Sequence, residues 1–116
     1  MKKRQAGKRR EAISVTRGSG NVFADIGLPD PERHLAKAQL VSLIDDALRA
    51  RGLTQQKAAA LLGIDQPKVS RMLRGHFEGI SIQRLLDFLT ALGRDVEIVV
   101  GPAPKSRKRG RLHVAA

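Results

Sequence analysis

Residues 53–74, LTQQKAAALLGIDQPKVSRMLR, contain the strongest structural signal in this chain of 116 residues. They predict two short helices that meet at Gly63, because glycine ends a helix in the left-handed conformation without strain. Thr54 and Asp65 can each accept a hydrogen bond from the backbone N–H groups at the start of a helix. We therefore expect one helix to follow Thr54 and a second to follow Asp65.

The second of these helices is expected to have two unlike faces. At about 100° per residue, Val69, Met72 and Leu73 share one apolar face. The opposite face is formed by Pro67, Ser70, Arg71 and Arg74. A second helix that packs by one face and presents cations on the other is typical of a helix-turn-helix, in which the second helix lies in the major groove of DNA.

Longer apolar patterns flank this pair. One helix is expected from the capping residue Asp30 to Gly52, and another from Ser81 to Gly93. Apolar residues recur at helical spacing in both. A further helical turn is expected within residues 21–28. The sequence therefore predicts a mainly α fold with four to five helices.

The pattern changes after Gly93. The segment Asp95–Val100 is rich in β-branched side chains and is followed by Gly101 and Pro102, which predicts a short strand. A strand needs a hydrogen-bonding partner. The candidates are the alternating segment at residues 13–15, a different protein, or the same strand of a second copy.

The net charge of +11 is carried by the two ends of the chain. Residues 1–20 contain seven Lys and Arg and one acidic residue, and residues 101–116 contain five Lys and Arg and no acidic residue. Both ends have little to bury, so we expect flexible basic arms around a domain at residues 21–100, with the helix pair at 53–75. Such arms are expected to bind DNA without sequence preference.

The composition disfavours several classes of function. The chain has no cysteine, which excludes disulfides, thiolate zinc sites and a cysteine nucleophile. Its three histidines are far apart, and no catalytic or metal-ligand pattern is found, so we expect a non-enzyme without a metal or cofactor. No apolar run approaches the roughly 20 residues of a membrane span. A cytoplasmic protein without membrane contact is therefore expected.

The helix pair resembles a known family. The phage-repressor-like (Cro-type or XRE-type) helix-turn-helix family has a pattern closely similar to Thr54-Gln55, Ala59, Gly63, Gln66, Val69-Ser70-Arg71, Leu73 and Gly75. Residues 20–100 resemble small bacterial regulators of that family, several of which are antitoxins of toxin–antitoxin modules. The resemblance implies a lambda-repressor-like domain and a repressor of transcription that binds double-stranded DNA at a palindromic operator. It also implies a homodimer, and it suggests a small toxin protein as a partner and autoregulation of the operon.

The resemblance also assigns roles to individual residues. The positions that contact bases in the family correspond to Gln66, Pro67, Lys68, Ser70 and Arg71. The positions that contact phosphates correspond to Thr54, Gln55, Gln56 and Arg74. Gln suits N6 and N7 of adenine, and Arg suits O6 and N7 of guanine. Pro67 departs from the polar residue often found at its position, so it offers van der Waals contact or only shapes the start of the helix.

The predicted strand supplies the expected dimer contact. Repressors of this type bind two half-sites about one helical turn, roughly 34 Å, apart. We expect the Asp95–Val100 strands of two copies to pair antiparallel across a twofold axis. The dimerisation residues would be Val96, Ile98, Val99 and Val100.

Two other classes of function stay open at this point. The protein could be an interaction module that neutralises a partner toxin through the strand and the fourth helix, with DNA contact secondary. Alternatively, its Arg-rich ends could bind RNA. Against the RNA alternative, the aromatic residues are three Phe, which give no stacking platform for unpaired bases.

Overall fold

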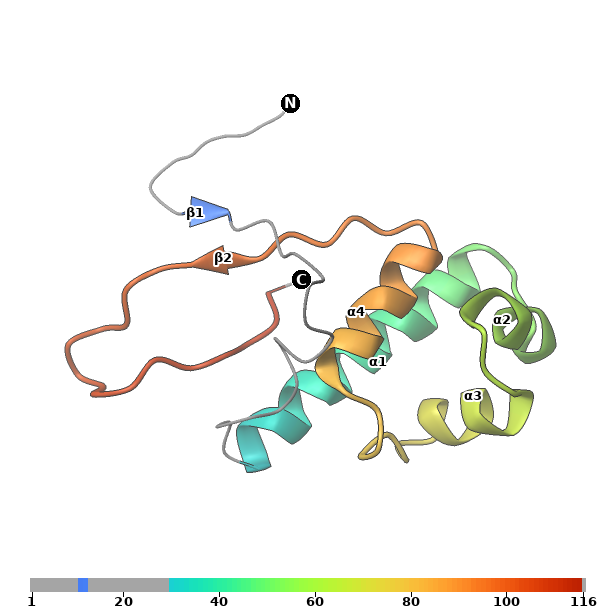
Figure 1. Ribbon diagram of the computed structural model, residues 1–116, viewed down its shortest axis with the longest axis horizontal. Coiled ribbons are helices and arrows are strands. Elements are labelled where there is room, and N and C mark those ends of the chain that lie inside the picture. The colour runs from blue at the N-terminus through green and yellow to red at the C-terminus, as the bar shows by residue number, and fades with distance from the viewer. Residues whose placement is uncertain (1–10, 13–29, 116) are drawn as a thin grey trace.

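The structure is a computed structural model that describes residues 11–12 and 30–115 (Figure 1). In this part of the chain the helices are α1 at Asp30–Ala50, α2 at Gln55–Leu62, α3 at Gln66–Leu73 and α4 at Ile82–Ala91. The strands are β1 at Glu11–Ala12 and β2 at Val99–Val100. The predicted mainly α fold is confirmed, and the turn expected at residues 21–28 lies outside the described residues. None of the described helices is long and apolar enough to cross a membrane.

Local capping fixes where three of the helices begin. The side chains of Thr54, Asp65 and Ser81 each accept a hydrogen bond from the backbone N–H three residues later, at 3.1, 2.8 and 3.1 Å. These caps satisfy N–H groups that have no partner inside the helix, and each contributes about 0.5–2 kcal/mol. Gly63 ends α2 with a φ of 75°, which favours glycine. The helix starts and the stop at Gly63 are therefore as predicted.

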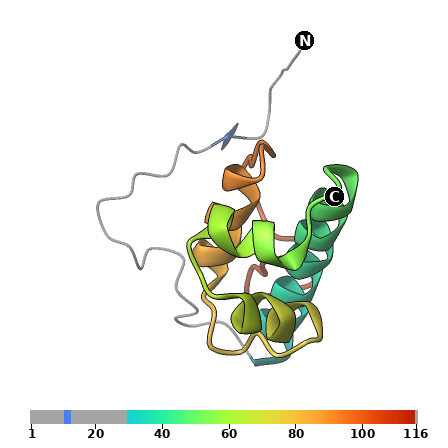
Figure 2. The ribbon, with the colours of Figure 1, turned by 90° about the vertical axis from the view of Figure 1, so that its right-hand side faces the viewer.

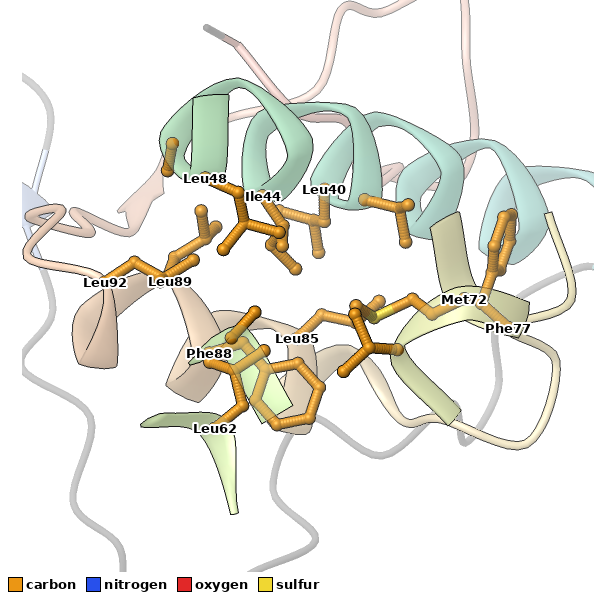
Figure 3. Packing of buried hydrophobic residues seen from close by; sticks show 14 of the residues in the cluster. Leu40, Ile44, Leu48, Leu62, Met72, Phe77, Leu85, Phe88, Leu89 and Leu92 are labelled. Atoms are coloured by element: carbon orange, nitrogen blue, oxygen red, sulfur yellow. The ribbon is translucent and has the colours of Figure 1, made fainter. Parts of the chain in front are cut away.

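The core is enclosed by the four helices. α1 and α4 run side by side, and α2 and α3 close one end (Figure 1 and Figure 2). The largest fully buried side chains are Ile44, Val69, Met72 and Leu85. Figure 3 shows Ile44, Met72 and Leu85 pointing from three different helices into one interior. Burying a side chain of this size contributes about 1.5–3 kcal/mol. The inner face of α3 is therefore firmly attached to the body.

The first turns of α1 hold the loop that follows α3. The Lys37 side chain is buried, and its Nζ donates a hydrogen bond of 3.1 Å to the carbonyl oxygen of Glu78. A buried ammonium group needs such an acceptor, so the contact is costly to break. The His34 ring stacks on the buried ring of Phe77, with 5.2 Å between the ring centroids. Together these contacts fix the end of α3 relative to α1.

The C-terminal strand is shorter than predicted. β2 covers Val99–Val100 rather than Asp95–Val100, and it pairs antiparallel with β1 of the same chain. The ladder is short because β1 offers two residues, and Val96 packs against the core instead of extending the strand. The segment at residues 13–15, which was one predicted partner, lies outside the described residues.

The segment after β2 returns to the body of the molecule. Figure 1 shows it as a long loop that turns back toward the helices. Leu112 and Val114 are half-buried and pack against the core. The backbone N–H of Leu112 donates a hydrogen bond to the carboxylate of Glu32 in the first turn of α1. Residues 101–111, which we call the C-terminal loop, are therefore attached to the rest of the chain at both ends.

Candidate nucleic-acid interface

The outer face of α3 is polar and cationic. Val69 and Met72 are fully buried on the inner face, whereas Gln66, Lys68 and Arg71 are exposed. The core thus fixes one face of the helix and leaves the other to solvent. Exposed Gln, Lys and Arg on a rigidly supported helix supply the hydrogen-bond donors that a major groove accepts.

Asp65 and Pro67 shape the start of α3. The carboxylate of Asp65 accepts the backbone N–H of Lys68, and Pro67 lies in the first turn, where its missing N–H would have no helical partner. Asp65 is also the single acidic residue within residues 53–75. The cap that stabilises α3 therefore places one negative charge at an otherwise cationic interface.

Ser70 and Arg74 form a pair at the end of α3. The Nη1 atom of Arg74 donates a hydrogen bond of 3.0 Å to Oγ of Ser70, and Ser70 is half-buried while Arg74 is exposed. This bond restricts the guanidinium group to the C-terminal end of the helix. The Ser70 hydroxyl keeps its own proton, which can still be donated to another acceptor.

α2 packs against α3, and its N-terminal end supplies the residues predicted to contact phosphates. Gln55 and Gln56 are exposed, and Thr54 accepts the N–H of Lys57 through its hydroxyl oxygen. The N-terminus of a helix carries partial positive charge and attracts phosphate. Lys57 is also exposed. It was not among the predicted contacts, although its place on the first turn of α2 adds a cation to this end of the interface.

The predicted dimerisation residues divide into two groups. Val96 and Ile98 are half-buried, and Val96 packs against the core. Val99 and Val100 are 44% and 50% exposed. The two valines of β2 are therefore the members of this set that present apolar surface to solvent.

Two residues that support the interface were not predicted. Lys37 and His34 hold the loop that follows α3, yet both lie on α1, far from α3 in sequence. A signal was available for Lys37, because it lies beside Ala36 and Leu40 on the apolar face of its helix. Within residues 11–12 and 30–115, no group of three His, Asp or Glu side chains could hold a metal ion.

Comparison with known proteins agrees with this geometry. Residues 22–101 match a family described as a helix-turn-helix domain, and this range contains α1 to α4 and β2. A solved structure assigned to the XRE family of transcriptional regulators is 42% identical, and the match covers 76% of this chain and 99% of the other, with a TM-score of 0.69. A search of curated proteins found no significant match.

Proposed function

This chain belongs to the helix-turn-helix domain family and is a DNA-binding transcriptional regulator of the XRE type; we propose that it is a repressor that recognises duplex DNA through α3. The operator in this proposal is palindromic, and the α3 helices of two copies enter adjacent half-sites. The proposal rests on the outer face of α3, whose polar residues stand on a helix that the core holds by Val69 and Met72.

The exposed residues of α3 have different roles in this proposal. Arg71 donates to O6 and N7 of guanine, and Gln66 pairs with N6 and N7 of adenine. Lys68 and Ser70 add donors to the same groove. Pro67 gives only van der Waals contact, for example to the methyl group of thymine.

The remaining predicted residues hold the DNA backbone in this proposal. Thr54, Gln55 and Gln56 donate to a phosphate at the N-terminus of α2, and Arg74 donates to a phosphate near the end of α3. The hydrogen bond from Arg74 to Ser70 supports this role, because a guanidinium group that is already positioned loses less freedom on binding. Phosphate contacts set the register of the protein on the duplex and carry no sequence information directly.

Selection of duplexes from a random-sequence pool tests the proposal. The wild-type protein should enrich a sequence with twofold symmetry, and each mismatched base pair should cost about 1–3 kcal/mol of binding free energy. Equal binding to all duplexes would contradict sequence-specific recognition. Stronger competition by single-stranded RNA than by duplex DNA would favour the RNA-binding alternative.

β2 supplies the dimer contact in this proposal. Its two valines are exposed, and β1 covers one edge of the strand, with Ala12 opposite Val99. Within the described residues the sheet consists of β1 and β2. The edge of β2 that faces away from β1 therefore has no described strand beside it. A two-stranded sheet is only marginally stable in water. A second copy that adds its own β2 antiparallel would extend the sheet and place the valines of the two strands beside one another.

Two proline variants test this dimer. In an antiparallel ladder, neighbouring residues direct their backbone hydrogen bonds to opposite edges. Val99→Pro and Val100→Pro therefore remove donors from different edges of β2, and the one on the outer edge should convert the dimer to a monomer and weaken operator binding. Sedimentation is the measurement. A monomeric wild type at micromolar concentration, or two variants that both stay dimeric with full operator affinity, would refute the arrangement.

The finer part of the proposal is an antitoxin role. It is supported by the resemblance of residues 20–100 to small regulators that include antitoxins, and it requires a toxin encoded beside this chain. The two proteins would then repress their own operon together. Co-expression with the product of the neighbouring gene should give a complex that co-purifies. It should also relieve the growth arrest that the toxin causes when it is expressed alone. If neither occurs, the protein is a regulator without that partner.

A further inference from the structure

The C-terminal loop concentrates charge that the α3 interface does not use. Its cationic residues are Lys105, Arg107, Lys108, Arg109 and Arg111. All are exposed except Arg107, which is half-buried. No acidic residue follows Glu97 in the sequence. The loop therefore has strong positive charge and no negative charge of its own.

The C-terminal loop is held at both ends. It begins directly after β2, which is paired with β1, and it ends at Leu112, which packs against the core and donates its N–H to Glu32. Within the loop, the N–H of Arg107 donates to the carbonyl oxygen of Pro104 at 3.0 Å and closes a turn. A loop held in this way loses less conformational entropy on binding than a free chain end does. Its charges are therefore better placed to bind a polyanion than those of a flexible arm.

The C-terminal loop and α3 lie at opposite ends of the molecule. Figure 1 places the loop at the left of the view and α2 and α3 at the right. Figure 2, seen from that right-hand side, has α3 near the viewer and the loop behind the helices. A duplex that crosses α3 at right angles to the long axis of the molecule therefore does not reach the loop of the same protomer.

We propose that the C-terminal loop is a second contact surface for the phosphate backbone of duplex DNA, and that it allows a protein bound through α3 to hold another DNA segment. Lys and Arg donate to phosphates whatever the base sequence. His113 is the single aromatic ring within residues 101–116, and no Phe, Tyr or Trp lies there, so unpaired bases have little to stack on, which favours a duplex. The bridging part rests on the proposed function of α3, whereas the affinity of the loop for duplex DNA does not.

Neutralising exposed charges tests the loop itself. The loop variant Lys105→Gln/Lys108→Gln is compared with the control variant Arg84→Gln/Arg94→Gln, which removes two exposed cations outside both the loop and α2–α3. Binding to a duplex of arbitrary sequence is measured at several salt concentrations. The loop variant should lower the slope of log K against log salt by about 2, since each phosphate contact contributes about 0.9. The same slope in the loop variant and the wild type would overturn the proposal.

Capture of a second duplex tests bridging. Each protein is bound to an immobilised duplex that the wild type selects from a random pool, and a labelled duplex of unrelated sequence is added. Wild type and control should capture the label, and the loop variant should capture several-fold less at equal occupancy of the immobilised duplex. Equal capture by the loop variant would overturn bridging. Bridging of duplexes would also be overturned if single-stranded RNA displaced the labelled duplex at a lower concentration than unlabelled duplex does. Failure to select any duplex would count against α3 instead, and the salt measurement would still decide whether the loop binds DNA.

Discussion

The outer face of α3 and the C-terminal loop both present Lys and Arg, but the chain supports them differently. α3 is capped by Asp65 and held by the fully buried Val69 and Met72. The loop is held by a two-residue strand and by the half-buried Leu112 and its neighbour Val114. Contact with a base edge requires donors held to within a fraction of an ångström, whereas attraction to phosphate does not. The comparison indicates that support, and not charge alone, separates the two proposed kinds of DNA contact.

The largest difference is expected in stability. Met72→Ala removes a fully buried side chain and should lower the free energy of unfolding by about 2–5 kcal/mol. Leu112→Ala removes a half-buried side chain that anchors the C-terminal loop and should cost about 1 kcal/mol. Urea denaturation followed by circular dichroism measures both. Equal losses would mean that the loop is as firmly attached as α3.

A smaller difference is expected in DNA specificity within α3. Arg71→Ala should lower discrimination at one base position of each half-site by about 1–3 kcal/mol, because a bidentate contact to guanine is lost. Arg74→Ala should weaken binding to all sequences alike, because it removes a phosphate contact. Specificity profiling of the two variants checks this. An unchanged sequence preference in the Arg71 variant would remove that residue from the proposed base contacts.

The smallest effect is expected at the cap of α3, where stability and DNA affinity should change in opposite directions. Asp65→Ala loses the hydrogen bond to the N–H of Lys68 and should cost about 0.5–2 kcal/mol of stability. It also removes a negative charge from the interface, so affinity at low salt should rise. Asp65→Ser is the matched control, because serine keeps a capping oxygen without the charge. Its stability should stay near that of the wild type while its affinity rises; weaker binding by this variant would assign the carboxylate a direct DNA contact.

Most of the helical fold could be predicted because its signals are local. The caps at Thr54, Asp65 and Ser81 bond to N–H groups only three residues away. The two faces of α3 follow from its apolar spacing, and the burial of Val69 and Met72 agrees with it. The base and phosphate contacts assigned to these residues depend on the geometry of bound DNA and stay predictions.

The contacts that were missed join distant parts of the chain. The bond from Leu112 to Glu32 spans 80 positions, and the bond from Lys37 to Glu78 spans 41. Leu112 and Val114 are only two apolar residues after a basic stretch, which is too short a pattern to indicate burial. The length of β2 likewise depends on β1, which lies in the part of the sequence with the weakest pattern.

The contacts of α1 with the loop after α3 limit how this protein can be divided. Because His34 and Lys37 secure Phe77 and Glu78, residues 53–75 are not a self-sufficient unit. Transplanting that helix pair into another scaffold would leave the loop that follows α3 without the contacts from α1 that hold it. A chimaera designed to borrow this protein's DNA preference should therefore carry α1 as well, and its junctions belong before Asp30 and after α4.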